Sequence, residues 1–385
     1  MKKSYNVLSL FDGMSCGQIA LKELNIPVAK YYASELDKHA IAQTQLNFPD
    51  TIQLGDVCKV KAKDLDKIDL VIGGSPCQGF SFAGKQLAFD DPRSKLFFEF
   101  VRLVEECRAI NPSVKFMLEN VGMKKEHQRV ITDYLGVWPV NINSNLVSAQ
   151  NRNRWYWTNI KTKEVGLFSE IHTDISQPKD RKIFLIDILQ PEKEVDKKHY
   201  LSKKAINSVL INPDNLQKSN INPTKSNPLQ CPGNSAGTYK GMSAVCVAMR
   251  GRNPDNPSDR SLGAPTEQRL EPKTDGKTNC LTSVAKDNLI LQLNQSKESG
   301  GVQPYQQNRV YHTAGKLPAL NAELGGRNNI LIPEDFKLRR LTPLECSRLQ
   351  TIPEWYKWEC CDTQQYRMLG NGWTVEVIKH LFKEL

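Results

Sequence analysis

The sequence has no CxxC pair, and its ten cysteines and six histidines are scattered along 385 residues. Structural zinc sites and disulfide frameworks need ligands or partners at short, regular spacings, so we expect neither, and no metal site. Cys360 and Cys361 are adjacent and cannot readily bond to each other. Thiols without disulfide partners are typical of a reducing cytoplasm, which is the expected compartment.

The sequence also lacks an apolar run long enough to span a membrane, and its first residues lack the apolar core of a signal peptide. We therefore expect no membrane association. Hydrophobic residues make up 39% of the chain and the formal net charge is +10. This composition indicates a globular protein with one large or two medium domains. The basic charge favours an anionic partner such as nucleic acid, although a lysine-rich surface can serve solubility alone.

Short apolar runs alternate with amphipathic stretches through the first part of the chain. The runs predict strands at residues 6–10, 28–34, 52–54, 69–73 and 114–118. The amphipathic stretches predict helices ending near Leu24 and Asn47, and a third helix beginning at Asp91-Pro92. That third helix has an apolar face made of Leu96, Phe97, Phe100, Leu103, Val104 and Cys107. Alternating strands and helices predict an α/β fold with a doubly wound, mostly parallel sheet.

The composition changes near Lys161. Residues 179–335 are rich in Asn, Pro, Gly, Ser, Lys and Arg, so we expect loops and short strands there. Order returns near Leu338, where Thr342-Pro343-Leu344-Glu345 is typical of a helix capping box, and residues 370–372 predict a turn. We expect one domain at 1–160, an inserted domain at 161–337, and a segment at 338–385 that completes the first domain.

Cys77 follows a buried strand that ends in Gly73-Gly74-Ser75-Pro76. A thiol placed on a loop at the edge of a sheet is a candidate nucleophile, because thiolates react readily in covalent catalysis. The residues after it are polar and glycine-rich, as a covering loop would be. A buried structural cysteine is the alternative interpretation of the Pro-Cys pair alone.

A second group of candidate residues lies where the first three predicted strands end. Phe11–Gly17 forms a glycine-containing turn after the first strand, Glu35 ends the second, and Asp56 follows the third. Glycines let a ligand approach the backbone, and a carboxylate can accept from ribose hydroxyls or an adenine amino group. Each acid alone could be a solvated loop residue. Together they predict an adenosine-bearing cofactor at a topological switch point.

Six motifs then occur in a fixed order. They are Phe11–Gly17, Gly73–Gln78, Glu119-Asn120-Val121, Gln150–Arg154, Arg340–Cys346 and Gly370–Val375. With these motifs the chain resembles the DNA (cytosine-5)-methyltransferases, in particular those of the bacterial and phage type. The resemblance covers nearly the whole chain except the middle segment, and implies a Rossmann-like S-adenosylmethionine-dependent methyltransferase fold. One departure is Met14-Ser15-Cys16, where many bacterial members have glycines.

The resemblance implies four catalytic residues. Cys77 would add to carbon 6 of cytosine, and Glu119, after the strand at 114–118, would protonate ring nitrogen 3. Arg154 would donate to the cytosine carbonyl, and Arg152 would orient the catalytic loop or Glu119. The two arginines are expected on one side of an extended segment.

The resemblance also implies S-adenosylmethionine as the methyl donor. The expected cofactor-binding residues are Phe11, Asp12, Gly13, Gly17, Glu35, Asp56, Val57, Pro76, Asn371 and Trp373. The target base would be flipped out of duplex DNA, and the loop at 78–86 would close over it. The middle segment would then be the target-recognition domain, using arginines at positions 250, 252, 260, 269, 309 and 327.

The expected partner is double-stranded DNA, and the expected state is a monomer in the cytoplasm of a bacterial or phage-infected host cell. A cognate restriction endonuclease acting separately is a further possible partner. Three alternatives stay open: an RNA cytosine-5 methyltransferase, an enzyme like thymidylate synthase, and a non-catalytic DNA-binding relative. The long basic segment favours DNA over RNA, and intact Cys77, Glu119, Arg152 and Arg154 favour an enzyme.

Overall fold

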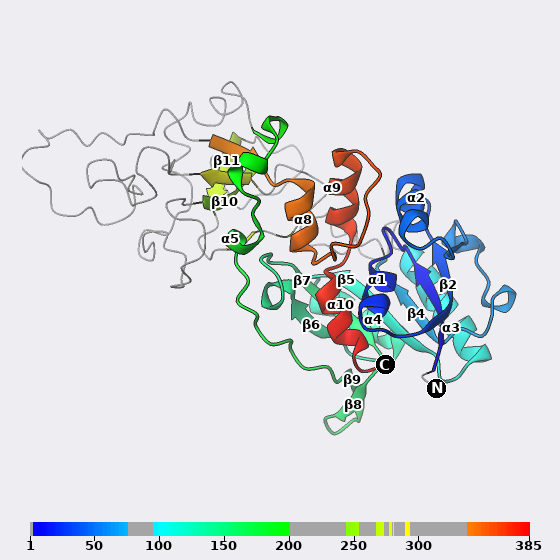
Figure 1. Cartoon of the computed structure of the whole chain (residues 1–385). Helices are drawn as coiled ribbons and strands as arrows, with labels where there is room; N and C mark the ends of the chain where they lie inside the picture. The colour runs from blue at the N-terminus through cyan, green and yellow to red at the C-terminus, as the bar shows by residue number, and fades with distance from the viewer. Residues whose placement is uncertain are drawn as a thin grey trace, which may run out of the picture. The chain divides into compact units, whose positions relative to one another are not determined.

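The computed structural model describes residues 3–75, 95–200 and 337–385, with 244–253, 267–272, 277, 278, 280 and 289–292 of the middle segment. The chain divides into two compact units, of which the first is built from both ends of the chain (Figure 1). This unit comprises residues 1–183 and 346–385, and the second unit comprises residues 184–345.

The first unit contains a seven-stranded sheet with the order β3-β2-β1-β4-β5-β7-β6. The strands are β1 (Tyr5–Leu10), β2 (Val28–Ser34), β3 (Ile52–Gln53), β4 (Leu70–Gly73), β5 (Lys115–Val121), β6 (Val140–Asn143) and β7 (Asn153–Thr158). Neighbouring pairs from β3 to β5 are parallel, whereas β7 runs antiparallel to both β5 and β6. The order reverses at β1, which places the switch point between β1 and β4. The predicted doubly wound, mostly parallel sheet is confirmed.

Helices cover both faces of this sheet. In the first unit they are α1 (Cys16–Glu23), α2 (Lys38–Asn47), α3 (Lys95–Ile110), α4 (Lys125–Leu135), α9 (Asp362–Asn371) and α10 (Val375–Phe382). Successive strand residues point to opposite faces. Accordingly, Val71 of β4 packs in the cluster with α3 and α4, whereas Ile72 lies against Gly17 of α1. Helix α1 in turn packs against α10.

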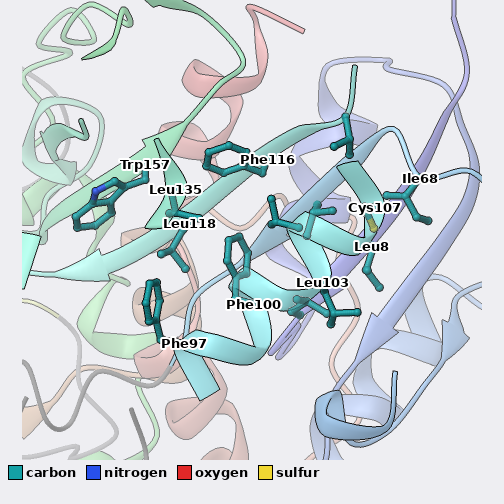
Figure 2. Packing of buried hydrophobic residues seen from close by; sticks show 14 of the residues in the cluster. Leu8, Ile68, Phe97, Phe100, Leu103, Cys107, Phe116, Leu118, Leu135 and Trp157 are labelled. Atoms are coloured by element: carbon teal, nitrogen blue, oxygen red, sulfur yellow. The ribbon is translucent and has the colours of Figure 1, made fainter. Parts of the chain in front are cut away.

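A hydrophobic core lies between the sheet and helix α3. Figure 2 shows Phe97, Phe100, Leu103 and Cys107 of α3 facing strand residues such as Phe116. The predicted apolar face of this helix is buried, apart from Leu96, which is partly buried. The predicted start of the helix at Asp91-Pro92 lies outside the described residues.

Two predicted boundaries are wrong. Strand β5 continues to Val121, so Glu119 lies within the strand, paired with Tyr156 of β7, and not after the strand's end. Gly370 and Asn371 are the last residues of helix α9 and not a free turn, because the amide of Gly372 closes the helix on the carbonyl of Met368 at 2.7 Å. Strand β5 therefore extends through the motif at 119–121, and helix α9 extends into the motif at 370–375.

The second unit contains a four-stranded antiparallel sheet with the order β11-β10-β12-β13. Its strands are β10 (Ala244–Arg252), β11 (Glu267–Pro272), β12 (Leu289–Gln292) and β13 (Lys337–Arg340). Arg250 and Arg269 are register partners in neighbouring strands. The arginines at positions 260, 309 and 327 lie outside the described residues.

The predicted capping box is confirmed at helix α8 (Pro343–Leu349). The amide of Thr342 donates to Glu345 Oε2 at 2.8 Å, and the amide of Glu345 donates to Thr342 Oγ1 at 3.2 Å. Glu345 also forms a buried ion pair with Arg339 of β13, with 2.8 Å between Nη1 and Oε2. This pair joins the sheet of the second unit to the start of α8.

The two units divide the chain at other positions than the expected 160/161 and 337/338. Residues 161–183 pack on the first unit through the hairpin of β8 (Thr162–Val165) and β9 (Glu170–Thr173). The amide of Trp138 donates to the carbonyl of Ile171 at 2.8 Å, and this backbone bond ties the hairpin to the first unit. No helix among the described residues is long and apolar enough to cross a membrane.

Candidate active site

The turn after β1 has an unusual backbone. Phe11, Gly13 and Ser15 all have positive φ angles of 57°, 59° and 64°, which side-chain-bearing residues rarely adopt. Alternating left-handed residues turn the chain sharply from the end of β1 into α1. Gly13 adopts such an angle without strain, whereas Phe11 and Ser15 adopt it although they carry side chains. The glycine-poor Met14-Ser15-Cys16 departure is therefore accommodated by strain, of about 1–3 kcal/mol per residue.

Asp12 explains how that strained turn is held. Its Oδ1 accepts from Ser9 Oγ at 2.5 Å and Tyr31 Oη at 2.9 Å, and its Oδ2 accepts from Ser15 Oγ at 2.5 Å. Burial raises the pKa of the Asp12 carboxyl to about 6, although the three hydroxyl donors oppose the rise. Asp12 thus braces the turn from inside, and Ser9 and Tyr31 are supporting residues that sequence reasoning did not find.

Glu35 stands at the carboxyl end of β2 and is fixed by backbone amides. Its Oε2 accepts from the Gly13 amide at 2.8 Å, and its Oε1 accepts from the amides of Leu36 and Asp37 at 2.7 and 2.8 Å. A carboxylate offers about four acceptor positions, so these bonds leave room for one further donor on Oε2. Such a preorganised acceptor fits a ribose hydroxyl.

Asp56 and Val57 lie beyond the end of β3. Asp56 Oδ1 accepts from the Cys58 amide at 3.0 Å and caps the short 3-10 helix η1 (Val57–Lys59). Val57 is buried, at 5% exposure, whereas Asp56 is only partly buried. The preceding Gly55 has φ of +71° and its carbonyl accepts from Ser34 Oγ at 2.7 Å, which ties this loop to the end of β2.

Gly17 shows why helix α1 can approach the sheet closely. A Cβ at this position would lie 2.3 Å from Ile72 Cδ1 and 3.3 Å from Tyr31 Oη. A side chain here would require Ile72 to move, so glycine lets the helix lie close to strands β2 and β4. The first turn of α1 is held near the end of β1, where the cofactor-binding residues are expected.

Glu119 lies at the centre of a second cluster, at the far side of β4 from the turn. Its Oε1 is 2.9 Å from Arg154 Nε, and its Oε2 accepts from the indole Nε1 of Trp373 at 3.2 Å. Glu119 is 9% exposed, so the ion pair is largely shielded from water. Gly74, after β4, lies beside the same carboxylate, because a Cβ there would be 3.0 Å from Oε2.

Arg152 binds the C-terminal segment. Its Nη1 donates to the carbonyl of Gly370 at 3.2 Å, and its Nη2 donates to that of Gly372 at 2.9 Å. Gly372 is next to Trp373, which contacts Glu119. Arg152 therefore binds the backbone beside Trp373, and Arg154 binds the Glu119 carboxylate that Trp373 also contacts. Asn371, between the two glycines, is exposed at the end of α9.

A buried amide network behind this cluster was not found from the sequence. Gln350, fully buried, donates from Nε2 to the carbonyls of Leu369 and Gly372 at 2.6 and 3.1 Å. Its Oε1 accepts from Gln150 Nε2 and Thr374 Oγ1, both at 2.8 Å. The network locks the segment before β7 to the start of α10. A lone glutamine just after a helix gives no sequence signal for such a role.

The expected nucleophile Cys77, Pro76 and the loop at 78–86 lie outside the described residues. Two other cysteines are poor candidates, because burial raises the pKa of both the Cys16 and the Cys107 thiol to about 12. The described residues contain no cluster of His, Cys, Asp and Glu that could hold a metal ion.

The sheet order, the switch point and the acidic strand ends define a Rossmann-like methyltransferase fold. Its hydrogen-bond acceptors suit the ribose and adenine of S-adenosylmethionine, because Glu35 and Asp56 present carboxylates at neighbouring strand ends beside the glycine turn. Comparison with known proteins agrees. The profile of the C-5 cytosine-specific DNA methylases matches residues 5–385, and the chain belongs to this family. It is a DNA cytosine methyltransferase that uses S-adenosylmethionine. This family membership excludes the alternative of an enzyme like thymidylate synthase.

Curated relatives match over the full length. The orphan methyltransferase M.SPRI of Bacillus phage SPR is 26% identical, over 98% of this chain and 97% of that protein. The type II methyltransferase M.HgiCI of Herpetosiphon aurantiacus is also 26% identical, over 100% and 98%. Among solved structures, the Entamoeba histolytica methyltransferase EhMeth superposes with a TM-score of 0.57 at 15% identity, covering 99% of this chain and 98% of that one. This last likeness concerns the fold alone.

Proposed function

We propose that this protein methylates carbon 5 of cytosine within a specific duplex DNA sequence, by flipping the base and forming a covalent bond between Cys77 and the ring. The observation that carries the proposal is the Glu119 cluster. A shielded carboxylate, held between Arg154 and Trp373, stands beside Gly74, the third residue before Cys77. The carboxylate and the cation therefore lie beside the residue from which the chain continues to the proposed nucleophile.

In the proposed mechanism the Cys77 thiolate forms a bond to cytosine carbon 6, and the electrons of the 5,6 double bond move into the ring. Protonated Glu119 donates its proton to nitrogen 3 as negative charge develops. Arg154 donates to the carbonyl oxygen, where charge also accumulates. Carbon 5 thereby becomes nucleophilic enough to take a methyl group.

When bound, S-adenosylmethionine supplies an electrophilic methyl group on its sulfonium sulfur. Glu35, Asp56 and the Phe11–Ser15 turn would hold it, with Val57, Gly17, Pro76, Asn371 and Trp373 around it. After methylation, the proton on carbon 5 leaves to solvent base, the 5,6 double bond reforms and the Cys77–carbon 6 bond breaks. Nitrogen 3 returns its proton to Glu119, so thiolate and acid are both regenerated.

Recognition of the target sequence is proposed for residues 161–337. The described part of this region holds the antiparallel sheet that carries Arg250, Arg252 and Arg269, and a sheet bearing cations can contact phosphates and base edges. We also propose a monomer that acts in the cytoplasm of a bacterial or phage-infected host cell, with any cognate restriction endonuclease acting separately.

Bisulfite sequencing of DNA from cells that express the protein tests the activity and identifies the sequence at once. The expected result is protected cytosines at one recurring sequence with the intact chain and none with Cys77→Ser. Replacing 179–335 by the equivalent segment of a relative should change the protected sequence. Absence of protected cytosines in DNA, with protection of cellular RNA, would contradict the proposal and favour the RNA alternative.

A further inference from the structure

Trp373 was expected only as a wall of the cofactor site, yet its polar atom faces the catalytic carboxylate. The indole Nε1 donates to Glu119 Oε2 at 3.2 Å in a buried setting, although the two residues are 254 positions apart. Glu119 Oε1 lies on the other side, 2.9 Å from Arg154 Nε. Each oxygen of the Glu119 carboxylate is therefore contacted by a different group: Oε2 by the neutral indole N–H, and Oε1 by the Arg154 cation.

The indole ring itself lies between the two halves of the site. Its Cζ3 would be 3.5 Å from a Cβ at Gly17, where α1 begins after the cofactor turn. Its Nε1 would be 3.0 Å from a Cβ at Gly74, in the strand end that leads to Cys77. The absence of side chains at both glycines lets one ring touch the cofactor turn, the nucleophile's strand and Glu119.

Both neighbours of Trp373 are anchored. The carbonyl of Gly372 accepts from Arg152 Nη2 at 2.9 Å, and Thr374 Oγ1 donates to Gln350 Oε1 at 2.8 Å and accepts from Ser144 Oγ at 2.9 Å. The anchored neighbours hold the backbone of Trp373, and its ring is buried, at 9% exposure, beside Gly17 and Gly74. The indole N–H is consequently a fixed donor, and a fixed donor can select one rotamer of the carboxylate.

We propose that Trp373 is a positioning residue for catalysis: its indole N–H fixes Glu119 Oε2, so that the carboxylate keeps Oε1 beside Arg154 and is presented to the target base in one orientation. This inference rests on the proposed role of Glu119 as proton donor. It assigns to the tryptophan a function in the chemical step that is separate from packing against the cofactor.

Trp373→Phe separates the two roles, because phenylalanine keeps an aromatic ring and loses the N–H donor. We expect kcat to fall about tenfold, while the KM values for S-adenosylmethionine and DNA stay within about twofold, since a bond to a charged group contributes roughly this much. Trp138→Phe is the matched control, because Trp138 stacks on His172 in the β8–β9 region and should leave kcat unchanged. A rise in the KM for S-adenosylmethionine with unchanged kcat would overturn the proposal, because Trp373 would then serve only as a wall of the cofactor site.

A second measurement needs no turnover. The protein has six tryptophans, so its indole N–H groups give six peaks in a proton–nitrogen correlation spectrum. Glu119→Ala should shift the Trp373 peak, which is identified by its loss in Trp373→Phe, and leave the Trp138 peak in place. If Trp373→Phe does not fold, the Trp373 peak is assigned from the backbone-linked spectra of the parent protein, and an unshifted Trp373 peak in Glu119→Ala contradicts the proposal.

The two measurements distinguish failure of this inference from failure of the proposed function. An active parent enzyme whose Trp373→Phe variant is equally active refutes the positioning role alone. A parent protein that methylates no DNA refutes the proposed function, and with it the role of Trp373 in the chemical step.

Discussion

The two halves of the site hold their carboxylates in different ways. On the β1–β2 side, Asp12 and Glu35 are bound by hydroxyls and backbone amides, all of them neutral donors from residues 9–37. On the β4–β5–β7 side, Glu119 is held by the Arg154 cation and the Trp373 indole, which come from distant parts of the chain. The carboxylates of the expected cofactor side are thus held by nearby residues, whereas Glu119, the proposed proton donor, depends on assembly of the whole unit.

This difference has a chemical consequence. Acids held by neutral donors remain good acceptors for hydroxyl and amino groups, as a cofactor needs. A carboxylate beside a guanidinium is fixed in place by charge, and the same guanidinium can move to a developing negative charge on the substrate. We therefore expect substitutions on the β1–β2 side to change the affinity for S-adenosylmethionine, and substitutions on the β4–β5–β7 side to change kcat.

The largest effect is expected at Arg154. Arg154→Ala removes the cation beside Glu119 and the proposed donor to the cytosine carbonyl, so kcat should fall about 10²- to 10³-fold. Single-turnover methylation measures this directly. Arg108→Ala is the control, because Arg108 pairs with Glu105 on the exposed side of α3 and should retain full activity. A change in KM without a change in kcat would mean that Arg154 serves binding, and would contradict the division of the site into a binding side and a chemical side.

The next largest effect is expected in the amide network. Gln350→Leu removes the side-chain donor to the carbonyl of Leu369, one of two such donors to that of Gly372, and the acceptor of Gln150 and Thr374, which should cost about 3 kcal/mol of unfolding free energy. Urea denaturation provides the measurement. Gln177→Leu, at an exposed position where the amide donates to the Asn141 carbonyl, should change stability by less than about 0.5 kcal/mol. Equal losses in the two variants would contradict a special role for the network.

Asp12 gives a pH-dependent prediction. Its folded pKa of about 6 lies above the ordinary value of 3.8, so the folded state binds a proton that the unfolded state releases. The resulting stabilisation is complete below pH 4 and is lost as pH rises through 6. The unfolding free energy of the parent, relative to Asp12→Asn, should therefore decline by on the order of 2 kcal/mol between pH 4 and 6. A constant difference across that window would contradict the raised pKa.

The smallest effect is expected at Glu35. Glu35→Gln keeps the size of the side chain but places an amide N–H group opposite one of the donors from Gly13, Leu36 and Asp37. We expect the Kd for S-adenosylmethionine to rise about tenfold, with kcat at saturation nearly unchanged. Calorimetric titration tests this, with Glu164→Gln on the exposed strand β8 as the control. A large loss of kcat would show that the β1–β2 side also serves the chemical step.

The sequence predicted the parts of the molecule that local patterns control. Alternation of apolar runs and amphipathic stretches was sufficient for β1, β2, β4 and α3, because burial of one face per element needs only local periodicity. The capping box at Thr342–Glu345 was likewise a local signal. The strand end at Val121 was missed because its pairing with β7 is set by a distant segment.

The candidate site divides in the same way. Glu35 and the Phe11–Gly17 turn could be found from their positions at strand ends. The contact between Trp373 and Glu119 could not, because nothing in either motif indicates which side chain in the other it meets. Tyr31 and Gln350 had no signal at all, since a tyrosine in a strand and a glutamine in the turn after a helix are ordinary core or surface residues until the chain folds.

The central claim is that the Cys77 thiolate bonds to the cytosine ring during methyl transfer. Duplex DNA with 5-fluorocytosine at the recognised position cannot lose the group on carbon 5 as a proton, so the reaction should stop with DNA attached to the enzyme. With S-adenosylmethionine present, we predict a slow-migrating protein–DNA band on a denaturing gel for the intact chain and none for Cys77→Ser. Methylation of ordinary cytosine without any such band on the fluorinated DNA would contradict the account.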